Sequence, residues 1–260
     1  MPPPSPHAPP FSHEYDYAPN GTFGPSWWNN GFTASNGECG VPFAARFPSP
    51  ASDATPFWYS FAFGDVLIVA VSSEHDWQEG SQQWLWLNST LAAADRSVTP
   101  WVVVSMHRPI YSTQECEAGD YVVALHMREA LDGLLWRHRV DVALVAHTHA
   151  YERTCGMSSV PGANCTTPGP QCGCAPAGTG TTHFTIGAAG AGLEGCGYSP
   201  QLGSYSQAHV NAWGLFYVDT ASVPGMMKVR FQLDADGSTF DEALVSHWSE
   251  EAARAVEATW

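Results

Sequence analysis

The chain alternates short apolar runs with amphipathic stretches. Residues 57–73 (FWYSFAFGDVLIVAVSS) form two strand-like runs around a central Gly-Asp pair, which predicts a hairpin. Residues 79–96 and 121–139 carry apolar side chains at helical spacing, and Ser81 is a candidate N-cap for the first of these helices. The pattern therefore predicts a strand pair followed by two helices.

Two fully apolar runs flank the second predicted helix. Residues 99–107 contain WVVV and residues 140–149 contain VALV, and such runs are typical of strands that are buried on both faces. The succession of strand, helix, strand, helix and strand predicts an α/β domain with a largely covered sheet. Further strand-like runs make the C-terminal part β-rich: residues 182–192, 213–220, 226–234 and 240–247.

Glycine and proline mark the irregular parts of the chain. Residues 1–10 are a Pro-rich lead-in that we expect to be extended or disordered. Residues 21–56 are rich in Gly, Pro, Asn and Ser, which predicts a long irregular surface segment. Residues 156–180 form a Cys/Gly/Pro-rich insertion between two predicted strands.

Composition and charge restrict the class of protein. The 260 residues are 44% hydrophobic and include 11 tryptophans, as expected of a packed globular chain. No apolar run approaches the ~18 residues that cross a bilayer, so we expect no membrane span. The net charge of −15, with Lys228 as the single lysine, argues against nucleic-acid binding. An anionic substrate would need a local cationic centre, such as a bound metal.

Sequons and cysteines predict a secreted or lumenal glycoprotein, although the chain shows no signal sequence. Asn20, Asn88 and Asn164 each begin an N-x-S/T sequon, so we expect glycosylation there. Four of the seven cysteines lie between Cys155 and Cys174. They could form a zinc site, but only one closely spaced pair is present, so disulfides within the insertion are favoured.

Three histidines mark the ends of predicted strands. His107 follows WVVV, while His147 and His149 follow VALV. Residues two apart on an extended strand point to the same face, so we expect the imidazoles of His147 and His149 to lie together. Three imidazoles at one sheet edge would form part of a metal site rather than serve as ordinary polar residues.

The carboxylates that would complete such a site are not evident. Asp132 lies within a predicted helix and Asp141 begins a predicted strand, so we expect both to lie away from the histidines. Glu14 and Asp16 flank His13, but their spacing is not a recognised ligand set.

Several motifs together resemble the purple acid phosphatases, which are calcineurin-like dimetal metallophosphoesterases. The strings are VVVSMHRPIYST, VALVAHTHAYERT, GECGVPFAARFP, SSEHDW, GSQQWLWL and THFTIGAAGAG, in the family's order. The resemblance spans about residues 11–247. It implies an αββα layered β-sandwich flanked by helices, with residues 11–155 as part of the catalytic domain and 181–248 as a β-rich C-terminal segment. It also implies that the N-terminal half of the domain is missing from this chain.

The same resemblance implies roles for individual residues. His107 and His147 would bind a divalent metal (Zn, Mn or Fe), and His149 would bind Fe(III). The family's G-N-H-E block falls on FSHE, so His13 would contact phosphate and protonate the leaving group. Ser12 stands where the family has an asparagine ligand and is a shorter oxygen donor. The family's carboxylate and tyrosine ligands are absent from this chain.

The function implied is that of an acid phosphatase, which hydrolyses small phosphate monoesters at a dimetal centre. Because the chain carries only part of the ligand set, we expect it to be inactive by itself. The alternative is a non-catalytic secreted glycoprotein that keeps the scaffold and at most one weak metal site.

Overall fold

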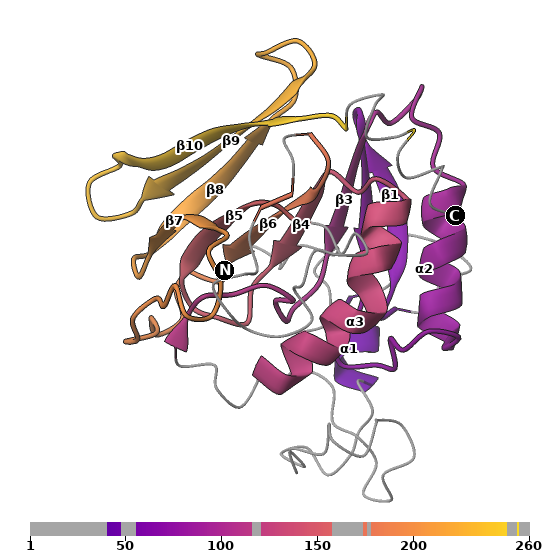
Figure 1. Ribbon diagram of the computed structural model, residues 1–260, viewed down its shortest axis with the longest axis horizontal. Coiled ribbons are helices and arrows are strands. Elements are labelled where there is room, and N and C mark those ends of the chain that lie inside the picture. Colours follow the sequence, from indigo (N-terminus) through magenta and orange to yellow (C-terminus); the bar gives the residue numbers. More distant parts are fainter. Residues whose placement is uncertain are drawn as a thin grey trace, which may run out of the picture.

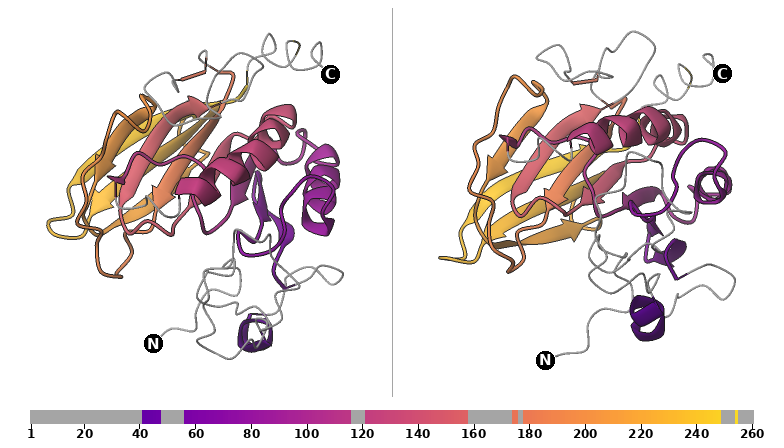
Figure 2. Two further views of the ribbon diagram at one scale, coloured as in Figure 1. Left: turned by 60° about the horizontal axis from the view of Figure 1, so that its bottom comes forward. Right: turned by 90° about the horizontal axis from the view of Figure 1, so that it is seen from below.

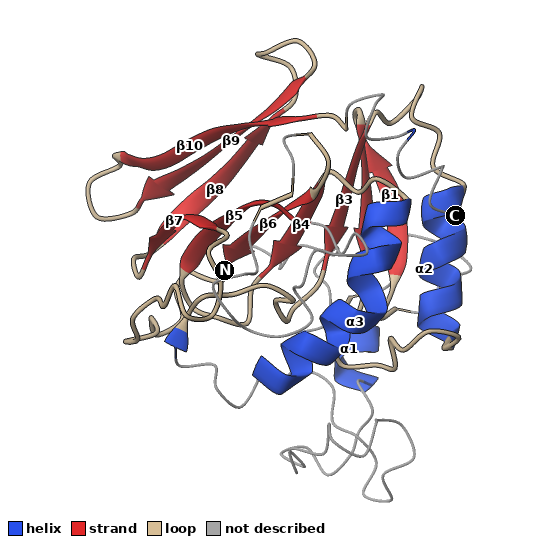
Figure 3. Ribbon diagram, in the orientation of Figure 1, coloured by secondary structure: helices blue, strands red, loops and turns tan. Residues whose placement is uncertain are grey.

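The computed structural model describes residues 41–47, 56–115, 121–157, 174–175, 178–248 and 254. Its elements in chain order are α1 (Val41–Arg46), β1 (Tyr59–Phe63), β2 (Val66–Ala70), α2 (Gln82–Ala92), β3 (Trp101–Ser105), α3 (Tyr121–Arg137), β4 (Val142–Val145), β5 (Tyr151–Met157), β6 (Thr181–Ile186), β7 (Ser206–Val210), β8 (Gly214–Asp219), β9 (Met226–Leu233) and β10 (Thr239–Ser246). Figure 3 shows how the helices and strands are distributed.

A large mixed sheet forms the centre of the molecule. Its strand order is β1-β2-β3-β4-β6-β5-β7, and β2, β3, β4 and β6 run parallel. Helices α2 and α3 cover one face, while the antiparallel sheet β10-β9-β8 packs against the other (Figures 1 and 2). The predicted layered α/β sandwich is confirmed.

The strand β3 shows why the central runs are apolar throughout. Val102 and Val104 point into the core beneath the helices, whereas Trp101 and Val103 point into the core between the two sheets. All four side chains are buried, because a parallel strand covered on both faces has no solvent-facing side. Each such side chain contributes roughly 1.5–3 kcal/mol of hydrophobic stabilisation.

The predicted hairpin turn and helix cap are both present at the expected residues. Gly64 (φ 60°) is the first central residue of the two-residue turn between β1 and β2, where its left-handed conformation suits a hairpin. The Ser81 hydroxyl accepts a hydrogen bond from the Trp84 N–H (3.2 Å), so it caps α2 as predicted. Leu87 and Leu91 then bury the inner face of this helix.

The C-terminal end of α3 has a conformation that usually favours glycine. Arg139 is left-handed (φ 53°), its N–H donates to Trp136 O (3.0 Å), and the Val140 N–H donates to Leu135 O (2.9 Å). These two hydrogen bonds define a Schellman cap. A residue other than glycine at this position costs about 1 kcal/mol.

Three elements were not predicted. Residues 41–46 form α1 within the segment that we expected to be irregular, and Pro42 in its first turn needs no N–H partner. The strands β5 and β7 contain polar residues that hide any apolar alternation. They form because they pair with each other and β5 also pairs with β6, a tertiary effect that local patterning does not contain.

The described residues bear on two predictions, the disulfides of the cysteine-rich insertion and the absence of a membrane span. Cys155 of β5 and Cys174 form a disulfide, which confirms the disulfide interpretation for this pair. Cys196 is also disulfide-bonded. None of the helices in the described ranges is both long and apolar enough to cross a membrane.

A histidine is buried in the core without polar partners. His183 on β6 is 1% exposed, and neither of its ring nitrogens has a hydrogen-bond partner among the described residues. The Tyr111 ring meets it edge-on at 4.9 Å between centroids. Burial lowers the pKa of His183 to about 3, and the charge of Arg128 acts in the same direction.

This pKa predicts an acid-sensitive fold. The unfolded chain takes up a proton near pH 6.5 but the folded chain does not until about pH 3, so the free energy of unfolding falls as the pH falls through this window. At about pH 4.5 the loss is on the order of 2–3 kcal/mol. His183→Leu removes this dependence and should not destabilise the protein at neutral pH, because no hydrogen bond is lost.

Urea unfolding at about pH 7 and about pH 4.5 measures the effect. The matched control is His126→Gln on α3, since the His126 side chain is 43% exposed and should leave the pH dependence unchanged. An equal loss of stability on acidification in His183→Leu and in the unsubstituted protein would show that the buried imidazole is not responsible.

Candidate metal and catalytic site

The parallel strands β2, β3 and β4 bring three loops to one edge of the sheet. Val103 of β3 is paired with Val142 of β4, so the residues that follow the two strands emerge side by side. Backbone hydrogen bonds continue the pairing beyond the strands, from Met106 N to Leu144 O (3.0 Å) and from Ala146 N to His107 O (2.9 Å). The carboxyl edge of such a sheet is where α/β proteins form their sites.

Two of the three predicted histidines meet at this edge. Nδ1 of His147 lies 3.0 Å from Nε2 of His107, and the rings are nearly perpendicular with centroids 4.8 Å apart. Two nitrogens that each lie about 2.1 Å from one ion are about 3.0–3.4 Å apart at octahedral or tetrahedral angles. The spacing is therefore compatible with one shared metal ion, as well as with the hydrogen bond between the two rings.

The third histidine lies in a turn rather than on an extended strand, so the alternation on which its shared direction with His147 was predicted does not apply here. Nδ1 of His149 lies 2.7 Å from the carbonyl oxygen of Gly192. The chain leaves β4 at Val145 and turns sharply, with Ala150 N donating to Thr148 O (2.8 Å). The alternation of an extended strand does not apply to a turn.

Glycine at position 187 allows this turn to pack against the end of β6. A Cβ on Gly187 would lie 2.2 Å from Thr148 O and 2.7 Å from Ala146 O, which no side chain could occupy. The backbone that carries His147 is therefore held against the sheet by a close approach that only glycine permits.

A buried ion pair lies beside the histidine pair, and the sequence did not single it out. Arg108 and Glu74 are joined by Nε and Oε1 at 2.9 Å, with side chains only 6% and 3% exposed. Nη1 of Arg108 lies 3.4 Å from Nε2 of His147. The available signal was a charged residue a few positions after each of two apolar strands, where a buried charge needs a partner.

Arg108 gives His147 an unusual neighbour for a metal ligand. A metal-bound histidine normally donates its second N–H to a carboxylate, a carbonyl or water. Arginine is always a donor, so the Arg108 contact favours a His147 ring whose Nε2 accepts and whose Nδ1 carries the proton. The proton would then lie on Nδ1 of His147, the nitrogen that would otherwise bind the metal. It would point at Nε2 of His107.

The residues Tyr151, Glu152 and Arg153, which follow His149, fix the neighbouring loop and join the two sheets. Glu152 is buried and accepts hydrogen bonds from Thr113 N (3.1 Å) and Thr113 Oγ1 (2.5 Å), which fixes the loop after β3. Tyr151 and Arg153 both donate to Asp241 of β10, at 2.7 Å each, and so join the two sheets.

These contacts also control protonation at the junction of the sheets. Burial alone would raise the pKa of Asp241, but the hydrogen bonds from Arg153 and Tyr151 lower it below its ordinary value. Burial, together with Asp241, raises the pKa of the Tyr151 hydroxyl. Asp241 is therefore ionised and Tyr151 neutral near neutral pH, as this hydrogen-bond pattern requires.

The loop after β2 borders the histidine pair on the side of α2. Gln83 of α2 clamps this loop, because its amide accepts from Ser72 N (2.7 Å) and donates to Ser72 O (2.9 Å). His75 follows and stacks near Phe57, with ring centroids 4.6 Å apart. Burial lowers the pKa of His75 to about 4, so this imidazole is neutral over most of the acidic range.

The other residues considered in the sequence lie elsewhere or outside the described ranges. Asp141 lies at the opposite edge of the sheet, where its carboxylate accepts from Val102 N (2.8 Å), as expected of a residue remote from the histidines. Asn88 lies on α2 with Oδ1 2.8 Å from Nε2 of His138. The remaining predictions fall outside the described residues: Ser12, His13, Asn20 and Asn164.

The spacing of the histidine pair is compatible with one metal ion, but the residues in the described ranges do not form a metal centre. Within those ranges, no group of three or more His, Cys, Asp or Glu side chains is arranged to hold a metal. No catalytic step through a second metal is therefore assigned to these residues.

Comparison with known proteins places this chain in a family. A family model described as calcineurin-like phosphoesterase matches residues 15–151, more than half of the chain. "Probable inactive purple acid phosphatase 27" of Arabidopsis thaliana is 35% identical over 186 residues, which cover 70% of this chain and 29% of that protein. "Probable inactive purple acid phosphatase 24" of the same plant is 31% identical over 239 residues, covering 90% and 36%.

A solved structure shows the same arrangement of elements. Purple acid phosphatase PPD1 from yellow lupin (Lupinus luteus) seeds superposes with a TM-score of 0.73 and 28% sequence identity, covering 93% of this chain and 40% of that one. The chain thus spans about a third of the length of the curated relatives that it matches. It belongs to the calcineurin-like phosphoesterase family and within it resembles the purple acid phosphatases.

Proposed function

We propose that this chain contributes to the metal-dependent hydrolysis of phosphate monoesters under acidic conditions, as an acid phosphatase. The observation that carries the proposal is the 3.0 Å separation of Nδ1 of His147 and Nε2 of His107 at the carboxyl edge of the sheet. A divalent ion held by this pair would act as a Lewis acid toward a phosphate oxygen. It would also supply the local positive charge that a chain of net charge −15 needs to attract an anion.

The roles of the remaining residues follow from the family resemblance. His149 would serve a second, ferric site through its Nε2, because Gly192 O lies at Nδ1 and can accept the second N–H, as in other metal-bound histidines. His13 would donate a proton to the leaving alkoxide, a role that suits an imidazole at mildly acidic pH. Ser12 would contribute a weak oxygen ligand in place of asparagine.

A secreted or lumenal location is part of this proposal. The disulfide between Cys155 and Cys174 supports it, because disulfides persist in oxidising compartments. The sequons at Asn20, Asn88 and Asn164 are compatible with passage through the secretory pathway.

A second candidate function is that of a non-catalytic glycoprotein with one weak metal site. The contact between Arg108 and His147 favours it, because a permanent cation 3.4 Å from the imidazole opposes both metal charge and the ligand tautomer. The names of two relatives, which are called probable inactive, agree with this interpretation for those proteins.

The first prediction concerns the histidine pair. Calorimetric titration with zinc should show one ion bound per chain, and His107→Ala or His147→Ala should each weaken binding by more than about tenfold. Any turnover of p-nitrophenyl phosphate at acidic pH by the protein supplied with iron and zinc should fall by at least about a hundredfold in both variants.

The matched control is His126→Ala, which removes an exposed imidazole from α3 and should change neither quantity. Full phosphatase activity in His107→Ala would contradict the metal assignment. Zinc binding at the pair without any turnover in the unsubstituted protein would reject the phosphatase and support the second candidate.

The second prediction concerns Arg108. The double substitution Glu74→Gln with Arg108→Gln removes both charges of the buried pair, so that no carboxylate is left unpaired. The new amide at position 108 can accept the Nε2 proton of His147, as the usual neighbours of metal-bound histidine do. Zinc affinity should therefore rise by about tenfold or more.

Glu74→Gln alone is the control, because it keeps the Arg108 donor and should leave the zinc affinity low. An unchanged or lower affinity in the double variant would show that Arg108 does not restrain the site. Thermal melts of all variants distinguish a change in the site from a loss of the fold.

A further inference from the structure

A cavity lies at the amino-terminal edge of the central sheet, away from the histidine pair. It is lined by Arg96, Pro100, Arg139, Asp141, His247 and Trp248. Pro100 and Asp141 directly precede β3 and β4, whereas His107 and His147 follow these strands. The two places are therefore separated by the length of a strand, roughly 15 Å at about 3.3 Å per residue. The cavity of about 290 Å³ is close to the lower limit for small-molecule sites.

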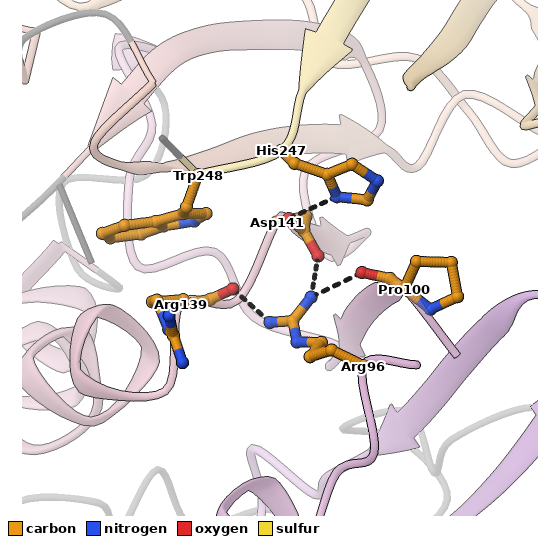
Figure 4. A pocket seen from close by; sticks show the side chains of 6 residues that line it. All are labelled: Arg96, Pro100, Arg139, Asp141, His247 and Trp248. Carbon is orange, nitrogen blue, oxygen red and sulfur yellow. Dashed lines mark hydrogen bonds and ion pairs between the residues drawn. The ribbon is translucent and has the colours of Figure 1, made fainter. Parts of the chain in front are cut away.

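Arg96 and Asp141 form an ion pair in the cavity lining, so their charges neutralise each other. Nη1 of Arg96 donates to Oδ2 of Asp141 (2.5 Å) and to Pro100 O (2.9 Å), and Nη2 donates to the carbonyl oxygens of His138 (3.2 Å) and Arg139. All four Nη hydrogens of Arg96 are therefore used within the protein. Figure 4 shows this guanidinium between the carboxylate and the backbone of residue 139.

Arg139 supplies an uncompensated charge at the same cavity. Its guanidinium makes no hydrogen bond or ion pair with any residue in the described ranges. Its backbone is held in the left-handed conformation of the Schellman cap, where glycine would be less strained. A strained residue with an unused charged side chain at a cavity suggests a function outside the fold's own stability.

The surroundings of Arg139 are cationic despite the acidity of the whole chain. Burial lowers the pKa of the neighbouring His138, and the charges of Arg137, Arg139 and Arg96 lower it further. Three of the ten lysine and arginine residues of the protein therefore act on one imidazole beside the cavity. Because Asp141 pairs with Arg96, the local positive charge next to the cavity comes from Arg137 and Arg139, and such a charge can attract an anion to a chain of net charge −15.

Planar side chains form the rest of the lining. In Figure 4, Trp248 and Arg139 lie on one side, with His247 and Pro100 on the other. The Trp248 indole is fixed by its N–H bond to Val140 O (3.1 Å), and His247 is stacked on Trp101 with ring centroids 3.6 Å apart. Rings held in this way offer rigid faces for a flat ligand.

We propose that this cavity binds a small aromatic monocarboxylate, with its carboxylate on Arg139 and its ring among Trp248, Pro100 and His247. Arginine matches the two oxygens of a carboxylate in one plane, and indole and imidazole faces suit an aromatic ring. A multiply charged oxyanion fits less well, because only one guanidinium is uncommitted and the Asp141 carboxylate lies in the same lining. The site goes beyond the phosphatase chemistry and does not depend on it.

Benzoate is the probe that tests this proposal. Calorimetric titration of the full chain should give a Kd of about 1 mM, as expected for so small a ligand. Arg139→Gly should weaken binding by at least about tenfold, since a charge-assisted hydrogen-bond pair is lost. The same substitution should raise Tm by about 2–4 °C, because glycine relieves the left-handed strain of the cap.

A rise in Tm together with weaker binding would show that Arg139 acts in binding rather than in stability. Arg139→Lys keeps the positive charge but lacks the paired N–H donors of the guanidinium, so it should bind benzoate with intermediate affinity. Arg46→Gln is the matched control, because it removes an exposed cation from α1 and should leave benzoate binding unchanged. Failure of benzoate to bind, or equal binding by Arg139→Gly, would overturn the site. Equal affinity for cyclohexanecarboxylate would overturn the aromatic component, and tighter binding of inorganic phosphate would overturn the ligand class.

Discussion

The parallel pairing of β3 and β4 is the constraint on which the rest of the structure depends. Both strands are buried on two faces, so their side chains fix the register on the helix side and on the sheet side together. Because the strands run in the same direction, His107 and His147 emerge as neighbours at one edge, and the Arg96–Asp141 pair forms at the other. A shift of one residue in the register of β3 against β4 would move side chains from one core to the other and would separate His107 from His147.

Much of the layered fold could be predicted from the sequence, because its signals are local. The WVVV and VALV runs, the Gly-Asp hairpin and the Ser81 cap each act over a few residues, and their positions agree with β3, β4, the β1–β2 turn and α2. β5 and β7 could not be found in this way, since partner strands stabilise them rather than an apolar alternation. Tyr151 and Arg153 of β5 nevertheless donate to Asp241 of β10 and so join the two sheets.

The candidate site was predictable in its residue types but not in its geometry. Three strand-terminal histidines indicated a metal site, yet β4 ends at Val145, so the alternation of a strand does not set the direction of His149. Arg108 and Glu74 escaped notice because a charged residue after a strand is ordinarily solvated. In the folded protein both are buried, so Arg108 determines which nitrogen of His147 can accept a proton or a metal. Whether the histidine pair binds a metal therefore depends on whether the metal or the Arg108 guanidinium controls the protonation of His147.

A crystal structure of the zinc-soaked protein, with anomalous data collected at the zinc absorption edge, tests this account most directly. We predict a single zinc ion within about 2.0–2.1 Å of both Nε2 of His107 and Nδ1 of His147, with the Arg108 guanidinium displaced from Nε2 of His147. Zinc bound elsewhere, or an unaltered contact between the two histidines at saturating zinc, would contradict the claim that this pair is the metal site.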